Sequence, residues 1–121
     1  MKQGDIVLTA LLQADGQVKN RPALFLRVMP PFNDALVCGI STQLHQQVPH
    51  FDELITHQDS DFTASGLVAD SVIRLGFLAV IPNSQLMGSI GSIAPERHRR
   101  LLQNLSDYLR NVSIILRQPN Q

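Results

Sequence analysis

The chain has 121 residues, of which 44% are apolar and 17% are charged, and its ten basic side chains balance ten acidic ones. This length predicts a single domain over residues 1–121, and the apolar content excludes an intrinsically disordered chain. Because the formal net charge is zero, the composition does not indicate a generally basic nucleic-acid binder, and any charged binding surface must come from local segregation of charge.

Three strands are predicted in the N-terminal part of the chain. Residues 6–12 are mostly apolar, and the turn-forming ADGQ at 14–17 starts a loop that we expect to run to residue 20. Residues 23–28 and 35–40 are short apolar runs separated by PPFND, a combination that breaks both helix and strand. We interpret these two runs as central strands.

The middle of the chain is polar and less regular. Only FDELIT at 51–56 shows a weak strand-like alternation, which predicts an edge strand between mobile connections. DSVIR at 70–74 and FLAVI at 77–81 are rich in β-branched and aromatic residues and predict two further strands. The glycines of MGSIGSI at 87–93 indicate a short strand with a bulge or a close backbone approach.

The last element has a helical period. Pro95 suits the first turn of a helix, and Glu96 complements the positive end of the helix dipole. One apolar stripe at helical spacing follows, formed by Leu101, Leu102, Leu105, Tyr108, Leu109 and Val112. Strands followed by one helix predict a mainly β fold with α structure, a small antiparallel barrel or curled sheet with a docked C-terminal helix. We expect a flexible tail at about 117–121.

Charge is segregated along the chain although the total is zero. Four acids, Asp52, Glu53, Asp59 and Asp61, lie in one short stretch, and Arg97, Arg99 and Arg100 cluster in the helix. We expect both groups to form solvated faces.

Compartment and membrane contact follow from simple counts. The single cysteine, Cys38, lies in an apolar run, where we expect a small buried side chain and no intrachain disulfide. The N-terminal apolar residues are too few for a signal peptide or a membrane span. These observations predict a cytoplasmic protein with no membrane partner.

Standard chemical motifs are missing from the sequence. His45, His50 and His57 lie in the polar middle segment at spacings that match no zinc pattern. A histidine pair can run phosphodiester cleavage by acid–base chemistry, but residues in such a segment are more often exposed loop side chains. The glycines match no phosphate-binding loop or dinucleotide fingerprint. We therefore expect neither a metal ion nor a cofactor.

Polar side chains at two strand ends are the remaining candidates. Pro22 fixes its own backbone angle and favours an extended Arg21, so a guanidinium is presented at a strand entrance. At the end of the third strand, ISTQ supplies the side chains of Ser41, Thr42 and Gln43. In a small antiparallel barrel these two ends lie on one rim, where a guanidinium and a hydroxyl can hold an anionic transition state. Ordinary surface polar residues remain the alternative.

The order and spacing of these segments resemble the MazF/PemK family of toxins from bacterial toxin–antitoxin modules. The similarity covers nearly the whole chain and is carried by GDIV (4–7), RPALFL (21–26), ISTQ (40–43), SGL (65–67), DSVIRL (70–75), LAVIPNSQLMGSIGSIAPE (78–96) and the final helix.

This resemblance implies an SH3-like or CcdB-like barrel that forms a homodimer and acts as a metal-independent endoribonuclease on single-stranded RNA, chiefly mRNA. It also implies a cognate antitoxin whose extended tail occupies the RNA groove. The family's catalytic pair, an Arg before Pro and a Thr at the end of the third strand, falls on Arg21 and Ser41. Here Ser41 replaces the threonine, and Thr42 takes the role if the register shifts by one.

The RNA contacts implied by the resemblance come from the same rim. The segment before Arg21 is shorter than in many relatives, so Lys19 and Asn20 are expected to supply its contacts, together with Thr42, Gln43 and Arg74. Bases in single strands are recognised by stacking and edge hydrogen bonds, and the stacking candidates are Phe32, Phe51, Phe62 and the plane of Arg74. Two alternatives are a non-catalytic binding module of this fold, either a decayed toxin or an inhibitor of a protein target, and an unrelated small barrel.

Overall fold

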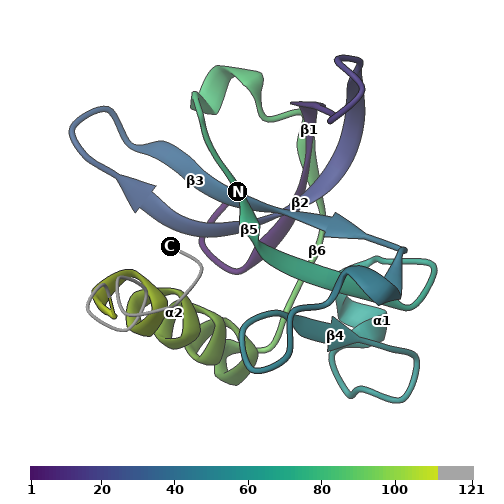
Figure 1. Cartoon of the computed structure of the whole chain (residues 1–121). Helices are drawn as coiled ribbons and strands as arrows, with labels where there is room; N and C mark the ends of the chain where they lie inside the picture. Colours follow the sequence, from purple (N-terminus) through teal and green to yellow (C-terminus); the bar gives the residue numbers. More distant parts are fainter. Residues whose placement is uncertain (112–121) are drawn as a thin grey trace.

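The structure, a computed structural model, describes residues 1–111 and consists of six strands and four helices (Figure 1). The strands are β1 (Asp5–Leu12), β2 (Val18–Met29), β3 (Asp34–Ser41), β4 (Glu53–Ile55), β5 (Ser71–Ile81) and β6 (Gly88–Ser92). The helices are α1 (Phe62–Ser65), α2 (Pro95–Arg110) and two short 3₁₀ helices, η1 (Leu44–Gln46) and η2 (Asn83–Gln85). The tail expected at 117–121 and Val112 of the predicted stripe lie outside the described residues.

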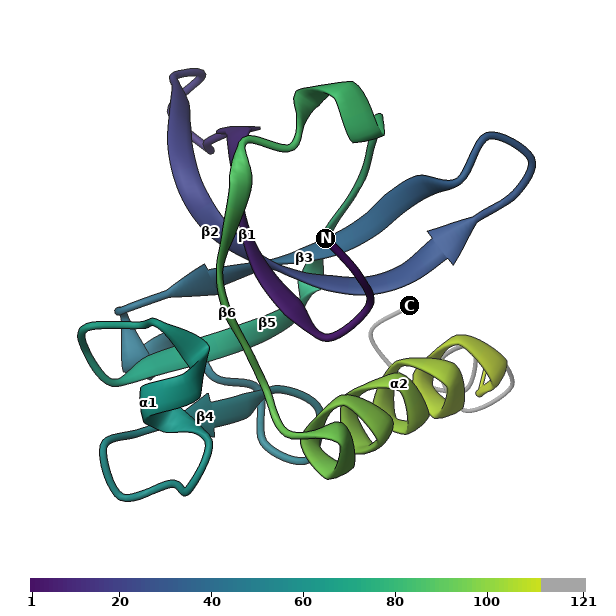
Figure 2. The ribbon, with the colours of Figure 1, turned by 180° about the vertical axis from the view of Figure 1, so that it is seen from behind.

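All six strands form one antiparallel sheet in the order β4-β5-β3-β2-β1-β6. The sheet curls strongly, and α2 lies along one side of it below the β2–β3 hairpin, as both views show (Figures 1 and 2). This half-barrel confirms the predicted mainly β fold with a C-terminal helix. The short β4 stands at one end of the order, so the predicted edge strand is also confirmed.

Each face of the curled sheet carries its own apolar cluster. Leu24 and Leu26 of β2 point to the face that α2 covers, where Leu101 and Leu105 of the helix join the cluster. Ala23 and Phe25 point to the other face and join Val7, Leu11, Ala35, Val37, Ile81 and Leu86. A strand covered on both faces has apolar residues at odd and even positions alike, which explains the unbroken run ALFL.

Bulges bend the strands into this shape. The ladder between β2 and β3 slips between Phe25 and Arg27, and that between β1 and β6 slips at Ile6 and Val7. The imidazole Nε2 of His98 donates to the carbonyl oxygen of Leu26, inside the first bulge, at 2.8 Å. Bulges increase strand twist and bending, and this one also connects the sheet to α2.

Two boundary predictions are wrong. Residues 71–81 form one long strand, β5, where two strands at 70–74 and 77–81 were predicted. Its pairing with β3 jumps from Arg74 to Leu78, and this irregularity bends the strand without ending it. The loop after β1 ends before residue 18, not at residue 20, because Leu12 pairs with Val18 and the hairpin closes through a bond from the Gln13 N–H to the Gln17 carbonyl at 2.7 Å.

The glycines of β6 confirm the expected close approach. A Cβ on Gly91 would lie 2.2 Å from the carbonyl oxygen of Ala64, and one on Gly66 would lie 2.0 Å from the carbonyl oxygen of Ile90. The backbones of α1 and β6 therefore touch, and only residues without a side chain permit this contact.

The acidic stretch and the helix cations do not form two solvated faces. Arg97 is buried and donates to both carboxylate oxygens of Asp61, at 2.8 and 3.1 Å, and to Glu53 at 2.9 Å. Arg100 forms two further bonds to Glu53, at 3.0 Å each. The two charged groups bind each other and attach α2 to the polar middle segment, while Arg99 alone of the three is exposed without such a bond among residues 1–111.

The middle segment is also more ordered than expected. It contains η1 and α1, which sequence reading missed, and Asp52 accepts from the N–H groups of Val48 and Leu75, both at 2.9 Å. Within residues 1–111, no helix is both long enough and apolar enough to cross a membrane.

Candidate nucleic-acid interface

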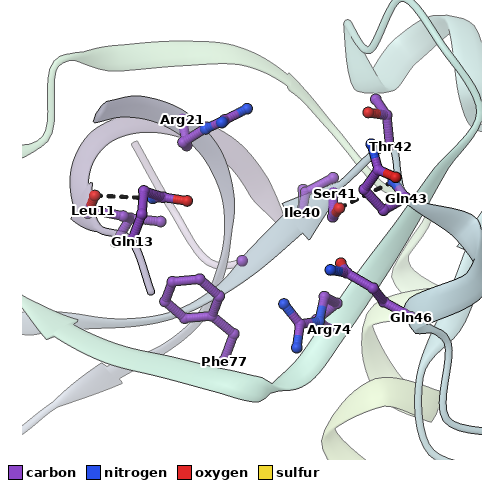
Figure 3. Close-up of a pocket in the computed structure, with 11 residues that line it drawn as sticks. Leu11, Gln13, Arg21, Ile40, Ser41, Thr42, Gln43, Gln46, Arg74 and Phe77 are labelled. Atoms are coloured by element: carbon purple, nitrogen blue, oxygen red, sulfur yellow. Dashed lines mark hydrogen bonds between the residues drawn. The ribbon is translucent and has the colours of Figure 1, made fainter. Parts of the chain in front are cut away.

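An open pocket of about 250 Å³ lies on the curled sheet where β2 begins and β3 ends (Figure 3). Its lining comes from β1, β2, β3, β5 and the segment after β3. The residues are Leu11, Gln13, Arg21, Gly39, Ile40, Ser41, Thr42, Gln43, Gln46, Arg74 and Phe77. Arg21 and Ser41, which the sequence singled out, therefore meet in one site. Ser41 ends β3 as predicted, but Arg21 is paired with Thr9 inside β2 and does not stand at the strand entrance, because the β1–β2 hairpin extends to Val18.

The alternation of the strands places these side chains. Residues two apart on a strand share a face, so the row Phe25 and Ala23 of β2 continues to Arg21. On β3 the row that starts at Val37 continues to Gly39 and Ser41, since Gly39 pairs with Ala23. The pocket is thus the open end of the second apolar cluster, at which polar side chains replace apolar ones.

Gly39 forms the floor of the pocket, and Phe77 lies over it. A Cβ on Gly39 would meet the Phe77 ring at 3.1 Å, so any side chain there would press on the ring. The guanidinium of Arg74 lies 5.8 Å from the centre of the same ring, within the range of a cation–π contact. Phe77 and Arg74 are both partly exposed, so together they offer a flat surface to the pocket.

The last residue of β3, Ser41, has a hydroxyl group that accepts a hydrogen bond within the following turn and keeps its own proton free to donate. The N–H of Gln43 donates to Ser41 Oγ at 3.0 Å, a bond in which the hydroxyl oxygen is the acceptor. The Ser41 O–H remains able to donate to a ligand. Figure 3 shows Arg21 and Ser41 on two sides of the pocket, with Phe77 and Arg74 along its lower edge, whereas Thr42 is exposed at the rim.

The pocket is cationic. Two guanidinium groups, Arg21 and Arg74, line it, and none of its eleven lining residues is acidic. Arginine stays charged throughout the pH range in which proteins fold. The site therefore suits an anion with several oxygen atoms, such as a phosphodiester.

The predicted contacts before Arg21 divide between two faces. Lys19 lies two residues from Arg21 and shares its face, whereas Asn20 pairs with Ala10 on the opposite face. Both are exposed, and neither lines the pocket. Lys19 can thus extend the cationic surface, while a role for Asn20 at this site has no support from the register.

Among the polar and aromatic residues of the pocket, sequence reading missed three, Gln13, Gln46 and Phe77. The Gln13 amide donates to the carbonyl oxygen of Leu11 at 2.9 Å. The side-chain oxygen of Gln46 is buried and has no hydrogen-bond partner among the described residues. No motif marks these positions, although the alternation of β1 predicts that a residue two beyond Leu11 shares its face.

The three phenylalanines proposed for stacking lie elsewhere. Phe51 packs against Tyr108 of α2, with ring centres 5.1 Å apart, and Phe62 is buried in the first cluster. Phe32 is exposed in the turn between β2 and β3. Of the stacking candidates, only Arg74 lines the pocket.

The histidines of the middle segment are exposed, as expected, and lie outside the pocket. The backbone N–H and imidazole of His57 hydrogen-bond to Asp70, and these bonds lower the pKa of that carboxyl. In the described part of the chain, no three His, Cys, Asp or Glu side chains are grouped so that they could hold a metal ion.

Two of three comparisons place the chain among known proteins. A family model described as "PemK-like, MazF-like toxin of type II toxin-antitoxin system" matches residues 2–109. Among solved structures, the Mycobacterium tuberculosis toxin MazF-mt6 is similar with a TM-score of 0.64 and 21% identity, over 88% of this chain and 96% of that one. At this identity the likeness shows the fold. A search among curated proteins finds no match.

Proposed function

Because the chain belongs to the PemK-like, MazF-like toxin family of type II toxin–antitoxin systems, we propose that it is an endoribonuclease that cleaves single-stranded RNA, chiefly mRNA. The observation that carries this proposal is the convergence of Arg21, Ser41 and Arg74 in one open pocket that has no acidic lining residue. An open cationic pocket suits an anionic polymer such as RNA. A non-catalytic binding module would instead be expected to have a filled or acidic groove.

The proposed reaction uses the RNA's own 2′-hydroxyl as nucleophile. The oxygen of that hydroxyl forms a bond to the adjacent phosphorus while the bond from phosphorus to the 5′-oxygen breaks. The 2′-hydroxyl loses its proton to solvent, and the departing 5′-oxygen gains one from solvent. The products are a 2′,3′-cyclic phosphate and a 5′-hydroxyl, so the reaction needs alignment and charge stabilisation more than covalent help from the protein.

Arg21 and Ser41 have separate tasks in this proposal. The Arg21 guanidinium neutralises the charge that grows on the phosphoryl oxygens, and the Ser41 hydroxyl donates to one of them. By analogy with an oxyanion-hole donor, each contact contributes about 10²- to 10³-fold in rate. Arg74 and Lys19 hold neighbouring phosphates, while Thr42 and Gln43 contact the chain at the rim.

Family membership also leads us to propose an antitoxin partner and a homodimer. An extended acidic segment would be attracted to the same two guanidinium groups that we assign to RNA. Antitoxin and RNA would then compete for one pocket, which explains inhibition without any change in the fold. We place this reaction in the cytoplasm, where mRNA is available.

The test is RNA cleavage by purified protein in EDTA, compared with Arg21→Ala. Arg27→Ala is the matched control, because Arg27 is an exposed cation on the same strand that does not line the pocket. We expect wild type and Arg27→Ala to yield 2′,3′-cyclic phosphate ends, and Arg21→Ala to be slower by about 10²-fold or more. Equal rates for all three proteins, or no cleavage of several diverse RNAs, would refute the proposal.

A further inference from the structure

We propose that Gln46 and Phe77 form a nucleobase subsite beside Arg21 and Ser41, which selects a base with an amino group at the purine C6 or pyrimidine C4 position, adenine or cytosine. The base stacks on Phe77, beside the Arg74 guanidinium that binds the adjacent phosphate, and the Gln46 side-chain oxygen accepts a hydrogen bond from the amino group of the base. This inference rests on the proposed function for its substrate class, single-stranded RNA, and assigns the chemistry by which one base is chosen.

The first observation is the unpaired oxygen of Gln46. Its Oε1 is buried without a hydrogen-bond partner among residues 1–111, although buried polar atoms are nearly always paired. The same side chain lines the pocket, and Figure 3 shows its amide directed between Ser41 and Arg74. The side chain as a whole is only partly buried, so a small rotation of its amide brings the oxygen to the pocket, where a donor on the ligand recovers an interaction that the free protein lacks.

The second observation is that Gln46 is held in place. Its N–H donates to the carbonyl oxygen of Gln43 at 3.0 Å within η1, and the chain just beyond is fixed by the buried Asp52. Asp52 accepts from Val48 on one side and from Leu75 of β5 on the other, both at 2.9 Å. Since β5 also carries Phe77, these hydrogen bonds fix the position of Gln46 relative to the ring on which the base stacks.

The third observation is the stacking surface itself. The Phe77 ring rests on Gly39 and borders the Arg74 guanidinium, and the two groups present π surfaces to the same pocket. Aromatic and guanidinium planes are the usual platforms for unpaired bases. A pocket of about 250 Å³ is smaller than the roughly 300–1,000 Å³ of sites for drug-sized ligands, so it suits one unit of a polymer.

The hydrogen-bond chemistry decides which bases fit. Adenine and cytosine present an amino donor, whereas uracil and guanine present a carbonyl acceptor at the equivalent position. An acceptor facing Gln46 Oε1 would leave two oxygen atoms opposed and unpaired in a partly closed site. We expect a preference of about 10- to 100-fold for adenine and cytosine, the usual size for one buried hydrogen bond with a specific partner.

The test measures binding of uncleavable 2′-O-methyl hexamers of A, C or U at one fixed low salt concentration. Wild type should bind the A and C hexamers about 10-fold or more tightly than the U hexamer. Gln46→Met should lose this preference, chiefly through weaker binding of A and C. Gln46→Glu keeps an acceptor oxygen and should keep the preference while binding all three more weakly. Phe77→Leu should weaken all three by about 5-fold or more.

The matched control is Gln47→Met, since Gln47 neighbours Gln46 but does not line the pocket; it should bind like wild type. A wild-type preference for U, no preference, no binding of any hexamer, or a preference that survives in Gln46→Met would each overturn the subsite. Because these hexamers cannot be cleaved, the result is independent of catalysis. A protein that binds with the expected preference yet cleaves no RNA would retain the subsite and refute the proposed enzyme.

Discussion

The ion-pair cluster around Arg97 should be a sensitive point of the fold. Arg97→Met removes the guanidinium but keeps an unbranched side chain of similar length. The Arg97 side chain is 8% exposed, and it bonds to Asp61, Glu53 and the carbonyl oxygen of Leu54, with the Asp59 carboxylate 3.3 Å away. The substitution leaves the nearly buried Asp61 carboxylate without its main partner and removes one of the three side-chain bonds to Glu53.

The size of the effect follows from what each carboxylate keeps. Breaking a buried ion pair by removing one partner costs about 3–5 kcal/mol. Asp61 retains the N–H of Ala94 at 3.0 Å, and Glu53 retains Arg100. The loss should therefore lie near the lower end, about 3 kcal/mol in the free energy of unfolding, which corresponds to a fall in Tm of roughly 10–15 °C.

The effect should depend on pH with a definite sign. Burial raises the pKa of Asp61, but bonds from Arg97 and the Ala94 N–H outweigh it, so the pKa lies below its ordinary value of 3.8. The pairing therefore stabilises the protein fully above that ordinary value, and this contribution is lost as pH falls through the lower folded-state pKa. The difference between wild type and Arg97→Met should be full at pH 6 and shrink below about pH 3.8.

Urea unfolding monitored by circular dichroism, repeated at several pH values, measures this difference. Arg99→Met is the control, because Arg99 is an exposed neighbour on α2 without a recorded ion pair among residues 1–111; it should shift stability by less than about 0.5 kcal/mol. Equal effects of the two substitutions would refute the claim that Arg97 holds the middle segment to the helix. A difference in unfolding free energy between wild type and Arg97→Met that stays constant down to pH 3 would also refute it.

Three further predictions concern other parts of the chain. Gly66→Ala should destabilise the protein by at least about 2 kcal/mol in urea unfolding, because its Cβ would clash with Ile90, whereas Gly76→Ala, with open space, should not. Burial raises the pKa of the Cys38 thiol, so a thiol reagent at pH 8 should label it only as fast as the protein unfolds; rapid labelling would contradict its burial. RNA affinity should fall with added salt, and Arg74→Ala should reduce the log–log slope by about 0.7; an unchanged slope would remove Arg74 from the phosphate contacts.

The fold was largely predictable because local patterns agree with it. The apolar runs that became β2 and β3 are short, bounded by turn residues and buried on both faces, and Pro95 and Glu96 mark the start of α2. The sequence predicted two strands where the structure has the single strand β5. The bend in β5 comes from its irregular pairing with β3 and has no turn residues that mark it in the sequence. Such irregularities depend on the neighbouring strand, which the local sequence does not encode.

Long-range pairing explains what sequence reading missed. Arg97 and Asp61 are separated by 36 positions. The residues next to each of them in the sequence do not indicate that the two will form an ion pair, so the sequence predicted that both would be exposed to solvent. Tyr108 and Leu109 continue the helical stripe by spacing but are exposed in the described structure, since the cluster on that face ends at Leu105.

The candidate site was only partly predictable. Arg21 and Ser41 stand beside apolar runs that the sequence marks clearly, although only Ser41 ends its strand, and the resemblance to a known family linked them. Gln46 and Phe77 carry no such mark, because η1 and the bend of β5 decide which way they face. Tertiary structure thus supplies the surface that would read the base, and the family pattern supplies the pair that would act on the phosphate.

The most direct test of the central claim is a double-mutant cycle on the single-turnover rate of RNA cleavage, with Arg21→Ala, Ser41→Ala and the double variant. Since both groups are assigned to one phosphate in one transition state, each single change should slow cleavage by about 10²- to 10³-fold. The double variant should be little slower than the worse single one, because groups that act as a unit are not additive. Wild-type rates for either single variant, or losses that multiply in full, would contradict the account.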